Sequence, residues 1–171
     1  YDNTPTDRVK RENIPGASWR IDGNKVTTHS VYPTDFNTVP VKRYILNGNG
    51  LEMAGIWNQG RLIEQVKTNP EGVSAYGYTD GQGNLIARRI PTSTSEYITT
   101  YYVYDEVGRQ RYVITPEAEK SFSSGTRTLA QLQADCYYYE YDQRGRLYRE
   151  YIPGAGYKSY LYDKRDRLVF S

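Results

Sequence analysis

The sequence predicts an all-β fold, an antiparallel meander of β-hairpins with a short α-helical insertion at about residues 115–135. Two observations lead to this prediction. Tyrosine-rich runs of six or seven residues alternate with four-residue polar turns, most clearly from Cys136 onward, and such alternation is typical of antiparallel strands. Of the 171 residues, 19 are Tyr and only 37% are hydrophobic, which favours sheets with half-exposed faces over a thick aliphatic core.

The charge is balanced and evenly spread. Twenty-two Lys and Arg stand against 20 Asp and Glu, without a block of one sign, so we expect no nucleic-acid partner. No apolar run approaches the ~20 residues that cross a bilayer, and we expect no membrane insertion of this segment. The chain begins inside one motif at Tyr1 and stops inside another at Ser171, which predicts a fragment of a longer protein.

We expect a single repeat-type β-sheet region over residues 1–171. Its first part, residues 1–22, is predicted to form a repeat-like hairpin, with Pro15 and Gly16 in a type II turn. Proline presets φ at the first central position of such a turn, and glycine takes the positive φ that the second requires.

The same turn is predicted near the other end of the chain. The phrase DRVKRENIPGASW recurs as GRLYREYIPGAGY, with seven of thirteen positions identical. Pro153 and Gly154 therefore predict a second type II turn between two strands.

The second part, residues 23–71, is predicted to form divergent β-hairpins. Its strands read VTTHSVY, VKRYIL, EMAGIW and RLIEQVK, and Asn-, Pro- and Gly-rich segments separate them. The tripeptide at residues 58–60, Asn-Gln-Gly, predicts a tight hairpin between the last two strands.

The third part, residues 72–171, carries the clearest repeats and the helical insertion. The segments PEAEK and LAQLQA are helix formers, Thr115 and Thr128 precede them as caps, and Gly125 breaks the chain between them.

Side chains alternate between the two faces of a strand. We therefore expect Tyr137, Tyr139 and Tyr141 on one face, with Tyr138 and Glu140 on the other.

A repeated unit can be aligned along the chain: Tyr-Asp, a short polar turn with Gly or Asp, Arg, an aliphatic residue and a strand. It starts at Tyr104, Tyr141 and Tyr162, and longer versions start at Tyr1 and Tyr78. The aspartate has a local use, because its carboxylate can accept backbone N–H groups of the turn two residues on. The arginine follows the turn and is near enough to pair across it.

This unit resembles the YD repeats of the bacterial RHS (rearrangement hotspot) family. The resemblance covers residues 97–171 strongly and residues 1–19 and 72–89 partly. It implies a structural motif made of repeat tyrosines, turn aspartates and turn glycines: Tyr104, Asp105, Gly108, Tyr141, Asp142, Gly145, Tyr162 and Asp163. Asp166 stands where glycine is usual, and Thr79 interrupts another copy, so these two turns are expected to differ.

In RHS proteins many YD repeats form a strip of hairpins that spirals into a hollow shell around a C-terminal toxic domain, and in some members a core segment releases that domain by aspartyl autoproteolysis. Neither the core segment nor an effector is present in this sequence, so no autoproteolytic aspartate carries over. The resemblance implies a non-catalytic structural segment of a secreted or cell-surface bacterial protein. Its partner is the remainder of the parent protein, and self-association through the sheet edges at Tyr1 or at residues 168–171 is expected.

Residues with chemical potential are few. His29 is the only histidine and Cys136 the only cysteine, so no internal disulfide exists, and we expect a surface strand histidine and a buried thiol. Asp80 opens DGQGN, which lacks the later acidic ligands of a calcium loop and predicts a hairpin turn instead. We assign no catalytic, cofactor-binding or metal residue, no cofactor and no enzyme activity.

Two alternatives remain at this point. A carbohydrate- or cell-surface-binding module would use exposed tyrosine faces, such as Tyr157 and Tyr160 among lysines and arginines. An enzyme would need an open pocket that gathers His29 or Cys136 with carboxylates.

Overall fold

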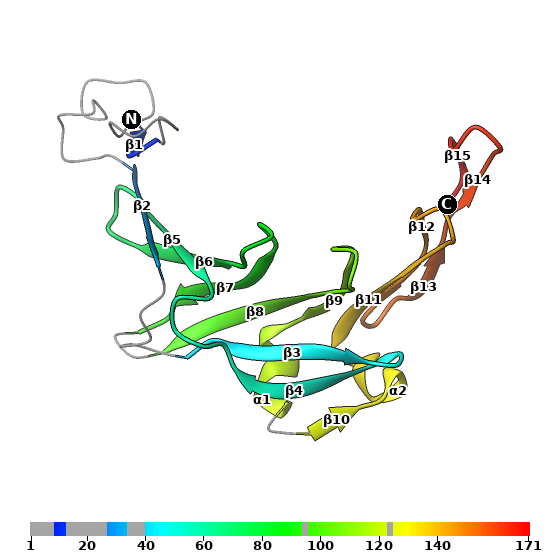
Figure 1. Cartoon of the computed structure of the whole chain (residues 1–171), viewed down its shortest axis with the longest axis horizontal. Coiled ribbons are helices and arrows are strands. Elements are labelled where there is room, and N and C mark those ends of the chain that lie inside the picture. The colour runs from blue at the N-terminus through cyan, green and yellow to red at the C-terminus, as the bar shows by residue number, and fades with distance from the viewer. Residues whose placement is uncertain (1–8, 13–26, 34–39, 94–95, 123–124) are drawn as a thin grey trace. The chain divides into compact units, whose positions relative to one another are not determined.

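The computed structural model describes residues 9–12, 27–33, 40–93, 96–122 and 125–171 (Figure 1). The regular elements of these residues are antiparallel strands and two short helices, which confirms the all-β prediction. The predicted turn at Pro15 and Gly16 lies outside the described residues.

Two compact units divide the chain. The first comprises residues 1–40 and 57–99, and the second comprises residues 41–56 and 100–171. The chain therefore crosses from one unit to the other three times, the last time within strand β8 (Tyr97–Tyr104).

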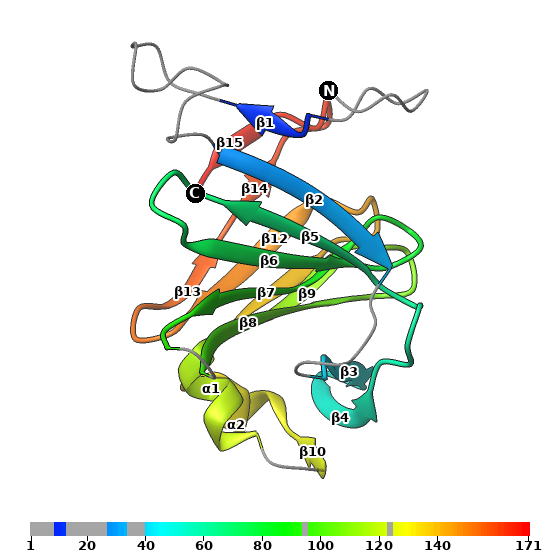
Figure 2. The same cartoon turned by 90° about the vertical axis from the view of Figure 1, so that its left-hand side faces the viewer.

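The first unit is an antiparallel sheet whose strands lie side by side in Figure 2. In spatial order they are β1 (Arg11–Glu12), β2 (Thr27–Pro33), β5 (Ile63–Thr68), β6 (Ser74–Thr79) and β7 (Leu85–Pro91). Tyr78 and Ala87 are directly paired and buried. The guanidinium of Arg89, also buried, lies 5.2 Å from the centre of the Tyr78 ring and donates a 2.7 Å hydrogen bond to the Pro40 carbonyl.

The hairpin predicted at residues 58–60 is wrong. A turn is present, because the N–H of Arg61 donates to the Asn58 carbonyl at 3.2 Å and Gly60 has φ of +73°. The flanking strands do not pair: β4 (Gly50–Ile56) lies between β10 (Gly125–Arg127) and β3 (Lys42–Asn47), and β5 lies between β2 and β6. Both edges of β5 are already occupied, so the turn serves as a connection between two sheets.

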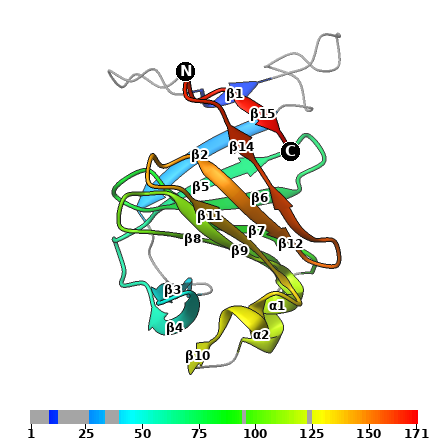
Figure 3. The same cartoon turned by 90° about the vertical axis from the view of Figure 1, so that its right-hand side faces the viewer.

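The second unit contains a larger sheet, a three-stranded sheet and a two-stranded one (Figure 3). In the larger sheet the strands follow the spatial order β8, β9 (Gln110–Ile114), β11 (Cys136–Tyr141), β12 (Leu147–Ile152) and β13 (Gly156–Ser159). The three-stranded sheet has the order β10 (Gly125–Arg127), β4, β3 (Lys42–Asn47), and the last hairpin pairs β14 (Leu161–Tyr162) with β15 (Leu168–Phe170).

The helical insertion forms as predicted, with a strand inside it. The Thr115 hydroxyl accepts the Ala118 N–H at the start of α1 (Pro116–Ser121), and Thr128 and Gln131 form a reciprocal capping box at α2 (Leu129–Leu132). Between the helices β10 pairs with β4. This approach is so close that a Cβ on Gly50 would lie 2.2 Å from the Arg127 carbonyl oxygen.

A tyrosine-rich core lies on one face of the larger sheet. Tyr44 from β3 packs edge-on against Tyr101 and Phe122, with 5.0 Å between ring centres in both cases. Tyr112 stacks on Tyr138 at 4.8 Å, and the Tyr112 hydroxyl donates to the Asn49 carbonyl. We call these five aromatic residues the aromatic core.

The alternation predicted for β11 is confirmed at the start of the strand, whereas a register shift between Glu140 and Tyr141 interrupts it at the end. Tyr138 is 2% exposed, whereas its neighbour Tyr137 is 37% exposed. Cys136 lies on the buried face, and burial raises the pKa of its thiol to about 12.

Candidate functional site

The most regular feature of the molecule is a hairpin turn built five times with one geometry. The turns begin at Asn69, Asp80, Asp105, Asp142 and Asp163, and we number their residues 1 to 5. In each, the N–H of position 1 donates to the carbonyl of position 5 at 2.9–3.0 Å, and the N–H of position 4 donates to the carbonyl of position 1 at 2.9–3.1 Å. This is a type I turn followed by a left-handed residue, a common three-residue hairpin connection. We call the five copies the turn series.

The side chain at position 1 fills the inside of its turn. One oxygen of Asp142 accepts the N–H groups of Arg144 and Arg146, both at 2.9 Å. In the other four turns the position-1 side chain likewise accepts the N–H groups of positions 3 and 5, at 2.8–3.2 Å. These side chains belong to Asn69, Asp80, Asp105 and Asp163. The local role expected of the aspartate is therefore the one that the structure displays.

The second carboxylate oxygen binds the side chain at position 5. Arg109, Arg146 and Arg167 donate from Nε to Asp105, Asp142 and Asp163 at 2.7–2.8 Å. Asn84 replaces arginine in the Asp80 turn and donates from its amide at 3.1 Å. Each of the four aspartates therefore uses both carboxylate oxygens within its own turn, whereas the Asn69 turn has Val73 at position 5.

Position 4 requires a left-handed backbone. Glycine occupies it in four turns, with φ between +78° and +87° at Gly72, Gly83, Gly108 and Gly145. The fifth turn places Asp166 there with φ of +61°, the one positive φ of a non-glycine residue in the described part of the chain.

Consecutive turns are joined through arginine and tyrosine. The guanidinium of Arg146 lies 4.7 Å from the centre of the Tyr162 ring, and the Tyr162 hydroxyl donates to the Leu147 carbonyl at 2.7 Å. One repeat earlier, Arg109 lies 5.1 Å from the centre of the Tyr141 ring, and Tyr141 donates to the Gln110 carbonyl at 2.8 Å. At both junctions the repeat tyrosine makes a cation–π contact with the position-5 arginine of the hairpin before it, and donates a hydrogen bond to the carbonyl of the residue that follows this arginine.

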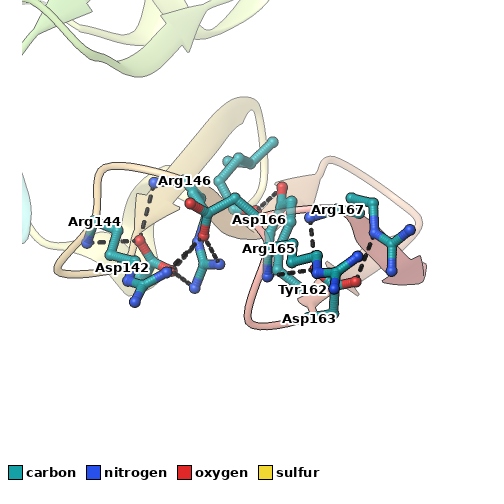
Figure 4. A network of polar contacts seen from close by, with 9 residues as sticks. Asp142, Arg144, Arg146, Tyr162, Asp163, Arg165, Asp166 and Arg167 are labelled. Carbon is teal, nitrogen blue, oxygen red and sulfur yellow. Dashed lines mark hydrogen bonds and ion pairs between the residues drawn. The ribbon is translucent and has the colours of Figure 1, made fainter.

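The junction between the last two turns carries a further contact (Figure 4). One oxygen of Asp166 accepts hydrogen bonds from Arg144 at 2.8 Å and from Arg146 at 2.5 Å. Arg146 consequently binds Asp142 of its own turn and Asp166 of the next turn, and stacks on Tyr162.

These contacts lower the pKa values of the turn aspartates. The Arg146 guanidinium, followed by the Arg146 N–H, holds the pKa of Asp142 below its ordinary value, and the Arg167 N–H is the main cause at Asp163. Burial of the Asp105 carboxyl group opposes ionisation, but hydrogen bonds from Arg109 outweigh it, and its pKa is lowered as well.

A second set of polar aromatic side chains lies on β12 and β13. The guanidinium of Arg149 lies 5.4 Å from the Tyr148 ring and 5.2 Å from the Tyr157 ring, and Tyr157 is 47% exposed. Nearby, the Tyr160 hydroxyl donates to Glu150 at 2.5 Å, which raises the pKa of Tyr160 to about 12.

The remaining candidates make ordinary structural contacts. His29 lies on β2 with Nε2 3.3 Å from Glu12, which also pairs with Lys67 at 2.7 Å. In the described part of the chain no three His, Cys, Asp or Glu residues gather as a metal site would require. None of the described helices is long and apolar enough to cross a membrane.

The geometry at Pro153 and Gly154 meets the requirements of a type II turn. Gly154 has φ of +77°, and the N–H of Ala155 donates to the Ile152 carbonyl at 3.0 Å.

Sequence reasoning missed the first member of the turn series. Asn69 and Gly72 occupy positions 1 and 4, the spacing that Asp105 and Gly108 show, but no Tyr-Asp pair precedes them. All four turns with glycine at position 4 share Asn or Asp three residues before that glycine, so this spacing identifies them where the Tyr-Asp pair does not.

Comparison with known proteins adds no family to this geometry. No protein-family model matches the sequence, and no curated protein matches it.

Proposed function

We propose that the chain is a non-catalytic structural segment of a secreted or cell-surface bacterial RHS-type repeat protein. In this role it forms part of a β-sheet strip or shell that encloses or presents a C-terminal effector. Its main partner is the remainder of the parent protein.

One observation carries the proposal: the arginine of one turn lies on the tyrosine of the next. Arg109 with Tyr141 and Arg146 with Tyr162 repeat the same contact at the same positions. A binding or catalytic site needs convergent groups with unused hydrogen-bonding capacity, whereas these groups are bonded to neighbouring hairpins. Nearest-neighbour contacts of this kind are what stabilise repeat architectures.

The proposal includes weak self-association through a sheet edge. Leu168, Val169 and Phe170 of β15 are exposed, and among the described strands β15 pairs only with β14. Exposed apolar edge strands tend to pair with other chains. We expect an apparent mass that rises with concentration in light scattering, and a clean monomer at high concentration contradicts this part of the proposal.

A second candidate function is a carbohydrate- or cell-surface-binding module. The observation that favours it is the exposed ring of Tyr157 beside the Arg149 guanidinium, with Lys158 on the same strand and Tyr160 directly after that strand. Stacking on aromatic rings is a usual way to hold a sugar, but Tyr157 also accepts a hydrogen bond from Gln133 of the insertion.

A glycan array with the full chain separates the two candidates. The structural role predicts no saturable binding, because the tyrosines serve internal packing. Saturable binding would overturn a purely structural role, and its loss in both Tyr157→Ala and Tyr160→Ala would place the sugar on β13 and the residue that follows it.

Tyr97→Ala is the matched control. Tyr97 is a half-buried tyrosine of the first unit that packs edge-on against Tyr76, with 6.0 Å between ring centres. Binding that survives in this variant and disappears in the other two is specific to the second unit, and circular dichroism of all three checks that the fold is kept.

A further inference from the structure

The last hairpin is the least supported part of the second unit. Among the described strands β14 and β15 pair only with each other, so no main-chain ladder joins them to β13. Leu161, Leu168, Val169 and Phe170 are all more than half exposed. An isolated two-stranded hairpin is at best marginally stable in water, so side-chain contacts must hold it in place.

Two residues of the hairpin make those contacts. Tyr162 lies under the Arg146 guanidinium and donates to the Leu147 carbonyl, which is the contact that Tyr141 makes one repeat earlier. Asp166 binds Arg144 and Arg146, and this contact has no counterpart in the earlier turns, where position 4 is glycine.

In the preceding repeat an arginine also lies near position 4, but the glycine there has no side chain to bind it. A Cβ built on Gly145 would lie 3.8 Å from Nη1 of Arg109, the same nitrogen through which Arg146 binds Asp166. The position-5 arginine therefore ends beside position 4 of the following turn in both repeats. The hairpin that contains Gly145, formed by β11 and β12, is also joined to β9 by main-chain pairing. The β14–β15 hairpin has no such pairing with another described strand.

We propose that Asp166 is an ionic lock that fastens the β14–β15 hairpin to the preceding turn where no strand ladder does so. Its carboxylate supplies the connection that strand pairing supplies elsewhere. It binds both Arg144 and Arg146, and Arg146 is also bound by Asp142. The cost of this contact is that Asp166 adopts a left-handed backbone conformation, which is unfavourable for residues other than glycine. This inference concerns contacts within the chain and stands whether or not the structural role proposed above holds.

Hydrogen exchange of the full chain, followed by NMR, tests the lock through the Asp163 and Arg167 amides. Asparagine tolerates the left-handed conformation, so Asp166→Asn removes the charge and keeps the backbone. We expect exchange of these amides to accelerate about two- to fivefold at low salt, the size typical of exposed ion pairs. Amides of β8 and β9 are expected to keep their rates. Unchanged rates at both hairpin amides overturn the proposal.

Asp166→Gly separates the lock from backbone strain. Glycine relieves the left-handed conformation and removes the carboxylate, so the lock predicts faster exchange and a strain-dominated turn predicts slower exchange. Slower exchange in this variant overturns the proposal.

Arg144→Gln and Arg165→Gln form a matched pair at position 3 of consecutive turns. Arg144 binds Asp166 through its side chain, whereas the contact recorded for Arg165 is its backbone N–H to Asp163. Only Arg144→Gln is expected to accelerate exchange, and 1 M NaCl, with a screening length of about 3 Å, should remove that difference. Equal effects of the two substitutions, or an effect that persists in salt, contradict an ionic lock.

Discussion

Tyrosine serves the aromatic core and the C-terminal hairpin of the second unit in different ways. In the core, Tyr101, Tyr112 and Tyr138 are almost wholly buried among other rings. In the hairpin, Tyr162 is half-buried and relies on a cation–π contact and a hydrogen bond to a carbonyl. The core is therefore stabilised mainly by removal of apolar surface from water, and the hairpin by polar contacts that depend on salt and geometry.

The largest expected effect is a cavity in the core. Phe122→Ala removes a ring that is 1% exposed and packs on Tyr44, and such truncations cost about 3–5 kcal/mol of the free energy of unfolding. Urea denaturation measures it. A loss below about 1 kcal/mol would mean that the insertion does not cover the core as the structure places it.

Substitution of Asp105 is expected to cause the next largest loss of stability. Its carboxylate accepts all the side-chain hydrogen bonds inside its turn, and the side chain is only 11% exposed. Asp105→Ala leaves two backbone N–H groups and the Nε of Arg109 without their acceptor and is expected to cost about 2 kcal/mol. Asp105→Asn should cost less, since Asn69 supports the same turn through its amide oxygen. Equal losses in the two variants would contradict the hydrogen-bonding role of the acceptor oxygen.

The lowered pKa of Asp105 also fixes the sign of a pH effect. A carboxyl group whose pKa is lower in the folded state stabilises the fold above its unfolded pKa of about 3.9, and this stabilisation is lost as pH falls through the folded value. Wild type should therefore lose stability below about pH 4 more steeply than Asp105→Asn. Parallel profiles in acid titrations followed by circular dichroism would argue against a lowered pKa.

Two conservative substitutions within the core should differ by a smaller amount. Tyr112→Phe removes the hydroxyl that donates to the Asn49 carbonyl and is expected to cost about 0.5–1.5 kcal/mol. The Tyr44 hydroxyl is buried and has no hydrogen-bond partner among the described residues, so Tyr44→Phe should be neutral or stabilising. Denaturation midpoints compare the two, and the reverse order would mean that the hydroxyl of Tyr44 is satisfied in solution.

The smallest effect is expected at the C-terminal hairpin. Phe170 is 65% exposed, so Phe170→Ala should change the free energy of unfolding by less than about 0.5 kcal/mol. Phe122→Ala is the natural control, being the same substitution in the core. A loss comparable to that of Phe122→Ala would mean that a further contact covers Phe170 in solution.

Local chemistry could be predicted from the sequence, and long-range pairing could not. The role of Asp142 in its turn, the caps at Thr115 and Thr128, and the alternation of Tyr137 and Tyr138 all depend on residues within a few positions of each other. The separation of β4 from β5 depends instead on distant partners, since β4 pairs with β10 about 70 residues later. Nothing in either segment alone specifies such a partner.

The candidate site divides in the same way. Arg146 binding to Asp142 follows from their spacing within one turn, and sequence reasoning anticipated such pairing. Its contact with Asp166 joins two hairpins through a position that otherwise holds glycine, so the sequence marked Asp166 as unusual without indicating what it binds.

The turns of this chain are self-contained. Every inner bond of the Asp142 turn joins residues 142–146, and the same holds for the turn at residues 105–109. A gene duplication that copied one such hairpin would deliver a finished connection together with the arginine and tyrosine needed to join it to its neighbours. Lengthening the array by whole hairpins therefore requires no new solution for folding the turn, and recombination within the gene has a simple unit to act on.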